Sequence, residues 1–190
     1  MESDVYRVYY AGDENTEVSS TSSEIPEAHQ TRRKLEEFHT GGPKAGAVDF
    51  AWPYLKDEDR FIQYAARVAL EHQPISEWKD KTLVEKDPKI LTQAMIAMAR
   101  HADKYQQPQM LQAMMGVDYG SLSNIDKQNL IRAFELTLFR QGVPAGELKS
   151  QLVAYLNPNF PSNDNHLDRV LSKVLVYIDA PDAVSKSIAL

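Results

Sequence analysis

The sequence predicts an all-α protein built as a stack of short helices. Apolar residues recur at helical spacing in one segment after another, and residues that start or stop helices stand between these segments. No apolar run approaches the roughly 20 residues that a membrane-spanning helix needs. Cysteine is absent, but a chain of 190 residues can bury a core without disulfides.

Helical spacing is clearest over residues 165–178, where Leu167, Leu171 and Val174 belong to one apolar stripe. The boundaries are marked by pairs such as Asp-Pro at 87–88, in which aspartate caps the helix and proline opens it. Ten helices follow from these signals. They are predicted over residues 26–39, 44–54, 60–72, 76–85, 88–102, 107–115, 124–141, 144–156, 165–178 and 182–189.

The first 25 residues differ from the rest in composition. Residues 4–10 (DVYRVYY) are β-branched and aromatic, which predicts a short strand. The acidic, Ser/Thr-rich residues that follow predict a disordered linker as far as residue 25. The helical domain is then expected over 26–190. A lone strand needs a sheet, and the start lacks a signal peptide. We therefore expect either a cytoplasmic protein or a piece cut from a longer chain.

The charge is unevenly distributed. Residues 1–30 hold seven acids and one base, whereas the remaining 160 residues hold 20 acids and 20 bases. Binding to nucleic acid or to an anionic membrane depends on clustered Lys and Arg. A neutral body without a basic stripe therefore predicts neither partner, and leaves protein as the expected one.

Two helical segments resemble each other. DRFIQYAARVAL from Asp59 aligns with DPKILTQAMIAM from Asp87 at an offset of 28 residues, although an offset of 30 also gives matches and both registers stay open. Each unit would be one helix pair in a stack. The matches at an offset of 28 are Asp59 with Asp87, Ile62 with Ile90, Ala66 with Ala94, Ala69 with Ala97, and Leu70 with Met98.

The alanines of these segments have a packing explanation. Alanines at i, i+3 and i+4 allow neighbouring helix axes to approach closely, whereas larger side chains would separate them. We therefore expect Ala65, Ala66, Ala69 and Ala94 to lie between layers of the stack.

The stretch LKDEDRFIQYAARVAL resembles a HEAT-like repeat of the phycobilisome-lyase-type solenoids. The resemblance is most specific over these 16 residues, weaker over 87–100, and does not extend beyond about residue 120. Arg60 stands where that family has proline, and Gln63 where it has an arginine that pairs with a neighbouring repeat. The residues that carry the resemblance are Leu55, Asp57, Asp59, Ile62, Ala65, Ala66, Ala69 and Leu70.

A wider resemblance involves the segments VYRVYY, RRKLEEFH, AVDFAWPYL, DRFIQYAARVALEHQP and LVYIDAP. Together they are similar to the helical segment of large bacterial secreted proteins. Those proteins combine a sugar-dehydrogenase-like propeller with a c-type cytochrome module. The resemblance implies a periplasmic or extracellular location, a multidomain parent and a first strand that ends the propeller. It does not make this segment an oxidoreductase.

No catalytic, cofactor or metal motif stands out. His39, His72 and His101 each lie near the end of a predicted helix, where a cation is favoured by the helix dipole. The alternative is that His72 and His101 share a metal with Glu71. Acid pairs, serines in turns and the glycines of HTGGPKAG lack the spacing of known catalytic or phosphate-binding motifs. We expect no catalytic residue and no cofactor.

Two functions are expected to compete. The first is a non-catalytic scaffold that binds neighbouring domains of a longer chain or another protein, with a stand-alone cytosolic adaptor as a variant. The second is a ligand-binding or lyase-like protein, with a pocket formed by Tyr64, Arg67, His72 and His101 on the concave face. The aromatic residues are expected in the core or at a binding hot spot, and the methionines of 110–115 in the core. The candidate interaction residues are Trp52, Tyr54, Tyr64, Arg67, His72, Trp78 and His101.

Overall fold

The computed structural model describes residues 5–14 and 26–190. Within them the chain is all-α, as predicted, and no β-strand occurs. Among the described residues no helix is both long and apolar enough to cross a membrane. The α-helices are α1 (Glu27–Glu36), α2 (Ala47–Ala51), α3 (Arg60–Glu71), α4 (Lys79–Val84), α5 (Pro88–His101), α6 (Gln107–Met115), α7 (Asn124–Gln141), α8 (Gly146–Leu156), α9 (Asn165–Tyr177) and α10 (Ala183–Ile188).

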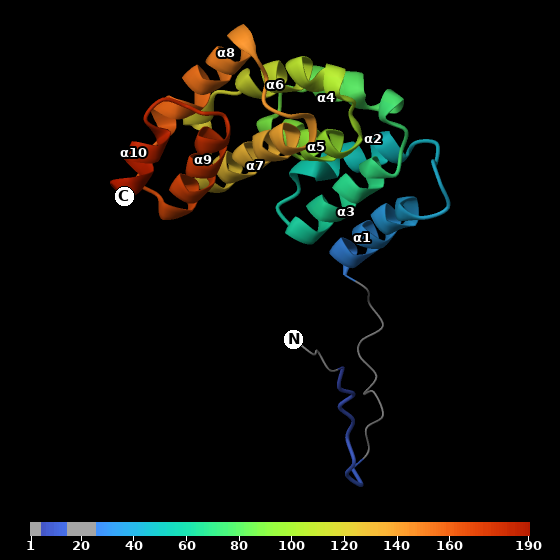
Figure 1. Cartoon of the computed structure of the whole chain (residues 1–190). Helices are drawn as coiled ribbons and strands as arrows, with labels where there is room; N and C mark the ends of the chain where they lie inside the picture. Colours follow the sequence, from blue (N-terminus) through green and yellow to red (C-terminus); the bar gives the residue numbers. More distant parts are fainter. Residues whose placement is uncertain (1–4, 15–25) are drawn as a thin grey trace.

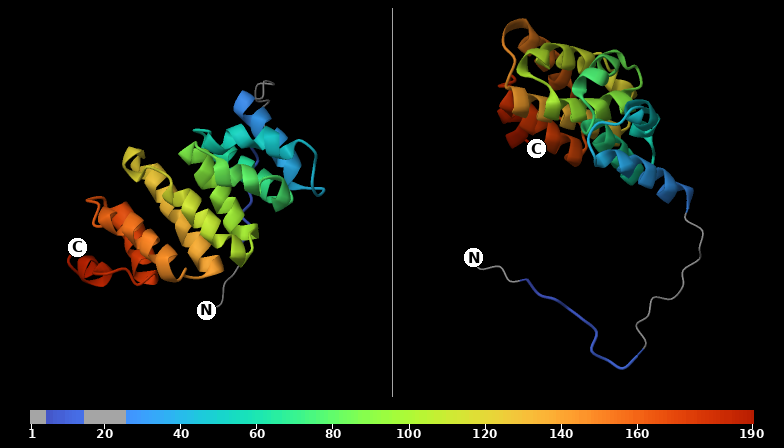
Figure 2. Two further views of the ribbon diagram at one scale, coloured as in Figure 1. Left: turned by 90° about the horizontal axis from the view of Figure 1, so that it is seen from above. Right: turned by 90° about the vertical axis from the view of Figure 1, so that its right-hand side faces the viewer.

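The helices form two rows (Figure 1). The outer row is α4, α6 and α8, which run along the top of the view, and the inner row is α3, α5, α7 and α9 beneath them. Each inner helix packs against the next, from α3 through α5 and α7 to α9, and α1 covers α3 at one end. Figure 2 shows that the helices follow chain order across the molecule. The architecture is therefore a stack in which each helix pair contacts its neighbours in sequence.

The inner helices share a starting device. A side chain before each helix accepts hydrogen bonds from the free backbone N–H groups of its first turn: Asp59 before α3, Asp87 before α5, Ser123 before α7 and Asp164 before α9. Between the first two caps the spacing is 28 residues, which settles the register of the repeat. The next two spacings are 36 and 41 residues, so the pairs are structurally equivalent but not equal in length.

The repeat register places small residues where two inner helices meet. Ala66 and Ala69 of α3 are completely buried, as are Ala94 and Ala97 of α5, and the two helices pack side by side. This agrees with the expectation that alanines permit close approach of the axes.

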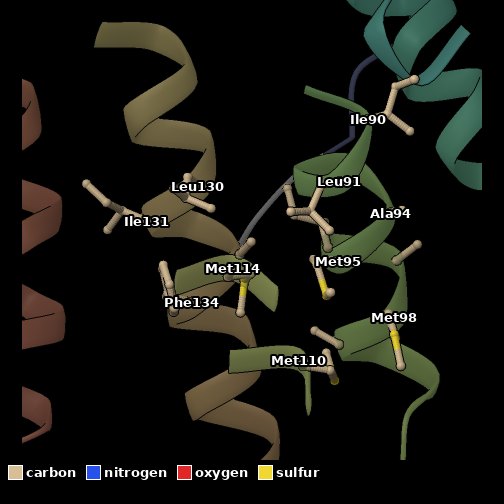
Figure 3. Close-up of a cluster of buried hydrophobic side chains, with 14 of the residues drawn as sticks. Ile90, Leu91, Ala94, Met95, Met98, Met110, Met114, Leu130, Ile131 and Phe134 are labelled. Atoms are coloured by element: carbon tan, nitrogen blue, oxygen red, sulfur yellow. The ribbon is translucent and has the colours of Figure 1, made fainter. Parts of the chain in front are cut away.

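The core centres on α5, whose residues from Ile90 to Ala99 are all buried. Figure 3 shows Met95 and Met98 of this helix facing the methionines of α6 and the apolar residues of α7. Met110 and Met114 are completely buried, as is Phe134. The prediction that the methionine-rich segment fills the core is therefore confirmed. Flexible thioether chains suit this place because they fill irregular space between helices.

An ion pair joins successive inner helices at their start. The Lys56 Nζ lies 2.9 Å from Asp87 Oδ2, in the cap of α5. Burial pushes the pKa of Asp87 upward, but the Lys56 ammonium and the N–H groups of Lys89 and Ile90 outweigh it, and the net pKa lies below its usual value. Lys56 thus supplies a link between repeats that the glutamine at position 63 does not.

The strand prediction was wrong for residues 5–10. They are extended but form no strand, and the side chains of Val5, Val8 and Tyr9 are more than three-quarters exposed. Because strand pairing needs a second strand, and the described residues hold none, β propensity alone does not produce a sheet. Residue 4 and the linker prediction over 15–25 lie outside the described residues.

Candidate interaction surface

The side of the inner row that faces away from the outer row carries large exposed side chains. In α3, Ile62, Ala66 and Ala69 are buried, and the opposite side presents Tyr64, 56% exposed. In α7, Phe139 is 76% exposed. We call this side the inner face. It is defined by Tyr64, Arg67 and Glu71 of α3, Gln93 and Arg100 of α5, Arg132, Glu135 and Phe139 of α7, and Lys173 and Tyr177 of α9.

Hydrogen bonds and ion pairs connect the inner face from α3 to α5. The Arg67 Nη1 donates to Gln93 Oε1 over 3.0 Å. Glu71 receives two arginines: Arg100 Nη1 at 2.9 Å and, from its own helix, Arg67 Nε at 3.6 Å. The Arg67 guanidinium also lies over the Tyr64 ring, 5.1 Å from its centroid. Arg67 is therefore held by polar groups from two adjacent helices.

Like charges gather around Arg67. Burial lowers the pKa of Arg67, and the positive charges of Arg100 and Arg132 lower it further, while Glu71 opposes them. Arg132, one helix further along, pairs with Glu135 at 2.6 Å. Three guanidinium groups from α3, α5 and α7 thus face one region, with two carboxylates between them.

A shallow groove continues the inner face between α7 and α9. It has a volume of about 140 Å³ and is lined by Glu135, Leu138, Phe139, Lys173, Val174 and Tyr177. The hollow lined by Gln63, Lys89 and Gln93 near the start of α5 holds only about 10 Å³. Pockets for drug-sized ligands are typically about 300–1,000 Å³. A larger hollow of about 370 Å³ lies beside the start of α5 and the end of α6, and none of the candidate residues lines it.

The aromatic candidates divide between core and surface. Trp78 is completely buried, and its Nε1 donates to the Gln73 carbonyl over 3.3 Å. Trp52 is 7% exposed and donates to Glu85 over 2.8 Å. Tyr54 is half-buried, so only Tyr64 of these four is a surface residue.

The two histidine candidates do not join Arg67 and Tyr64. The His72 ring stacks on His39, with 6.0 Å between centroids, at the side of α3 that faces α1. His101 meets Trp78 edge-on, with 6.5 Å between centroids. Glu71, the third member of the alternative metal site, is engaged by arginines. The described residues contain no group of three or more His, Cys, Asp or Glu side chains suited to a metal ion.

Sequence reasoning identified Tyr64 and Arg67 but missed Arg100, Arg132 and Phe139. Arg67, Arg100 and Arg132 are 33 and 32 residues apart, which matches neither repeat register. The signal that could have found them is charge: α3, α5, α7 and α9 together hold nine bases and four acids, in a body that is neutral overall.

Comparison of the chain with protein-family models, with curated proteins and with solved structures finds no match.

Proposed function

We propose that the chain is a non-catalytic helical scaffold of the HEAT-like type, which binds protein through its inner face. The observation that carries the proposal is the continuity of this face. Exposed aromatic and charged side chains run over four successive inner helices, from Tyr64 to Tyr177, without enclosing a pocket of ligand size. Stacks of helix pairs characteristically offer such extended surfaces to protein partners.

The composition of the inner face also supports a protein partner. Tyrosine and arginine are enriched where binding energy concentrates in protein interfaces, and Tyr64 with Arg67 forms such a pair. The wider resemblance adds that the partner is a neighbouring domain of a larger exported protein. In that setting the stack would hold two modules in fixed relation.

The alternative, a pocket formed by Tyr64, Arg67, His72 and His101, has less support. A ligand site needs polar groups that converge on one cavity. Here His72 stacks on His39 and His101 packs on Trp78, while Tyr64 lies beside Arg67. We therefore favour the scaffold.

Photo-crosslinking in the source cells tests the proposal. We expect benzoylphenylalanine at position 139, on the inner face, to give discrete crosslinked protein products. The matched control is the same residue at position 105, on the turn between α5 and α6, because Tyr105 is 77% exposed and Phe139 76%. Equal products from both positions, or products from position 105 alone, would contradict binding through the inner face.

A further inference from the structure

The positive charge of the body is concentrated on the inner helices. The described acids of the body are used largely at helix starts: Asp59, Asp87 and Asp164 each accept backbone N–H groups as caps. Asp168 is buried and accepts from the Ser162 N–H over 2.6 Å. Few carboxylates are left to offset the arginines and lysines of the inner row. A neutral chain therefore presents a basic surface on one side.

The arginines of the inner face retain hydrogen-bonding capacity. A guanidinium group has five N–H donors. Arg100 donates once to Glu71 and Arg132 once to Glu135. Their side chains remain 41% and 54% exposed, so their other donors are open to solvent. Planar donors of this kind match the two oxygens of a carboxylate or a phosphate.

We propose that the inner face binds an extended acidic segment of its protein partner, with Arg67, Arg100 and Arg132 as the carboxylate-binding residues. This inference rests on the proposed function and specifies the chemistry of the partner. The three arginines come from consecutive inner helices, so the segment crosses the helices and follows the stack. Tyr64 and Phe139, at the borders of the cluster, contact apolar side chains that alternate with the acids.

The carboxylates already present on the inner face favour this partner over a nucleic acid. Glu71 and Glu135 lie among the three arginines. A nucleic acid carries a negative charge at every phosphate and would meet these carboxylates directly. An acidic protein segment can place neutral side chains opposite them, because its charges need not be continuous.

Fluorescence anisotropy tests the inference on the full chain. The probe is a fluorescein-labelled peptide of four Glu-Ser-Tyr units, and the matched peptide has glutamine for each glutamate. We expect the glutamate peptide to bind and the glutamine peptide to bind at least tenfold more weakly. Binding should also weaken as sodium chloride rises, because the contacts are between exposed charges.

Single substitutions locate the site. Arg132→Gln and Arg100→Gln are each expected to raise the dissociation constant about tenfold or more, since each removes a charge-assisted hydrogen bond. The control is Lys149→Gln on α8, which also loses one positive charge and one ion pair, with Asp179, and should leave affinity unchanged. Circular dichroism checks that every variant is folded.

Three results would overturn the inference: no binding of the glutamate peptide, equal binding of the glutamine peptide, or equal losses in the arginine variants and in Lys149→Gln. Inorganic phosphate and a 12-nucleotide single-stranded RNA provide the remaining arms. If either bound more tightly than the peptide and depended on Arg132, the site would be one for phosphate groups. Failure here with crosslinks intact at position 139 would refute the acidic partner and leave the scaffold standing.

Discussion

Replacing Trp78 by alanine is expected to lower the free energy of unfolding by about 3–5 kcal/mol, the usual cost of deleting a buried aromatic side chain. Trp78 is the largest completely buried side chain among the described residues. Its indole N–H bonds the Gln73 carbonyl, and its own carbonyl accepts from Thr82 Oγ1 over 3.0 Å in the first turn of α4. Removing the ring would leave a cavity between the end of α3 and the start of α4.

The effect of Trp78→Ala is measured by urea unfolding followed by circular dichroism. Trp78→Phe serves as a control, because it keeps most of the buried apolar volume but loses the hydrogen bond to Gln73. We expect the phenylalanine variant to lie between the wild type and the alanine variant. A loss below about 1 kcal/mol for Trp78→Ala would mean that the site is not the tight junction described here.

Enlarging a buried alanine between the inner helices is expected to have the second-largest effect. Ala66→Leu should lower the free energy of unfolding by about 1–3 kcal/mol or more, because added methylenes in a packed core force side chains and backbone apart. Ala66 is completely buried in α3, the helix that packs against α5. The change tests whether small residues set the distance between repeats.

The matched control for Ala66→Leu is Ala154→Leu in α8, since Ala154 is exposed. Both changes add the same atoms to a helix. Exposed substitutions usually alter stability by no more than about 0.5 kcal/mol, so the control should unfold like the wild type. Similar losses in both variants would show that the cost comes from the helix and not from the contact between repeats.

Most of the helical pattern was predictable because two independent signals agree in the sequence. Apolar spacing gives the helix, and a capping side chain such as Asp87 or Ser123 gives its start. Where backbone geometry decides, the boundaries moved. The second helix was predicted from residue 44, but Gly46 has φ of 78° and α2 begins at Ala47.

The inner face was predictable only in part. Tyr64 and Arg67 stood out because they lie in the segment with the clearest repeat. Arg100 and Arg132 come from helices whose caps are 28 and 36 residues further on, while the arginines follow a different spacing. Unequal repeats bring residues together through the angles and offsets between helices, which periodicity along one chain does not encode. The buried tryptophans show the same limit, since aromatic residues suit core and interface equally.

Native-state hydrogen exchange tests the central claim, that the helix pairs form one stack able to hold partners in fixed relation. Because α5 is buried along residues 90–99 and packs against both α3 and α7, the account predicts that its amides exchange most slowly. Protection should fall gradually toward α1 and α10. Two separately protected blocks, with fast-exchanging amides in α5 between them, would contradict a single stack and with it a rigid scaffold.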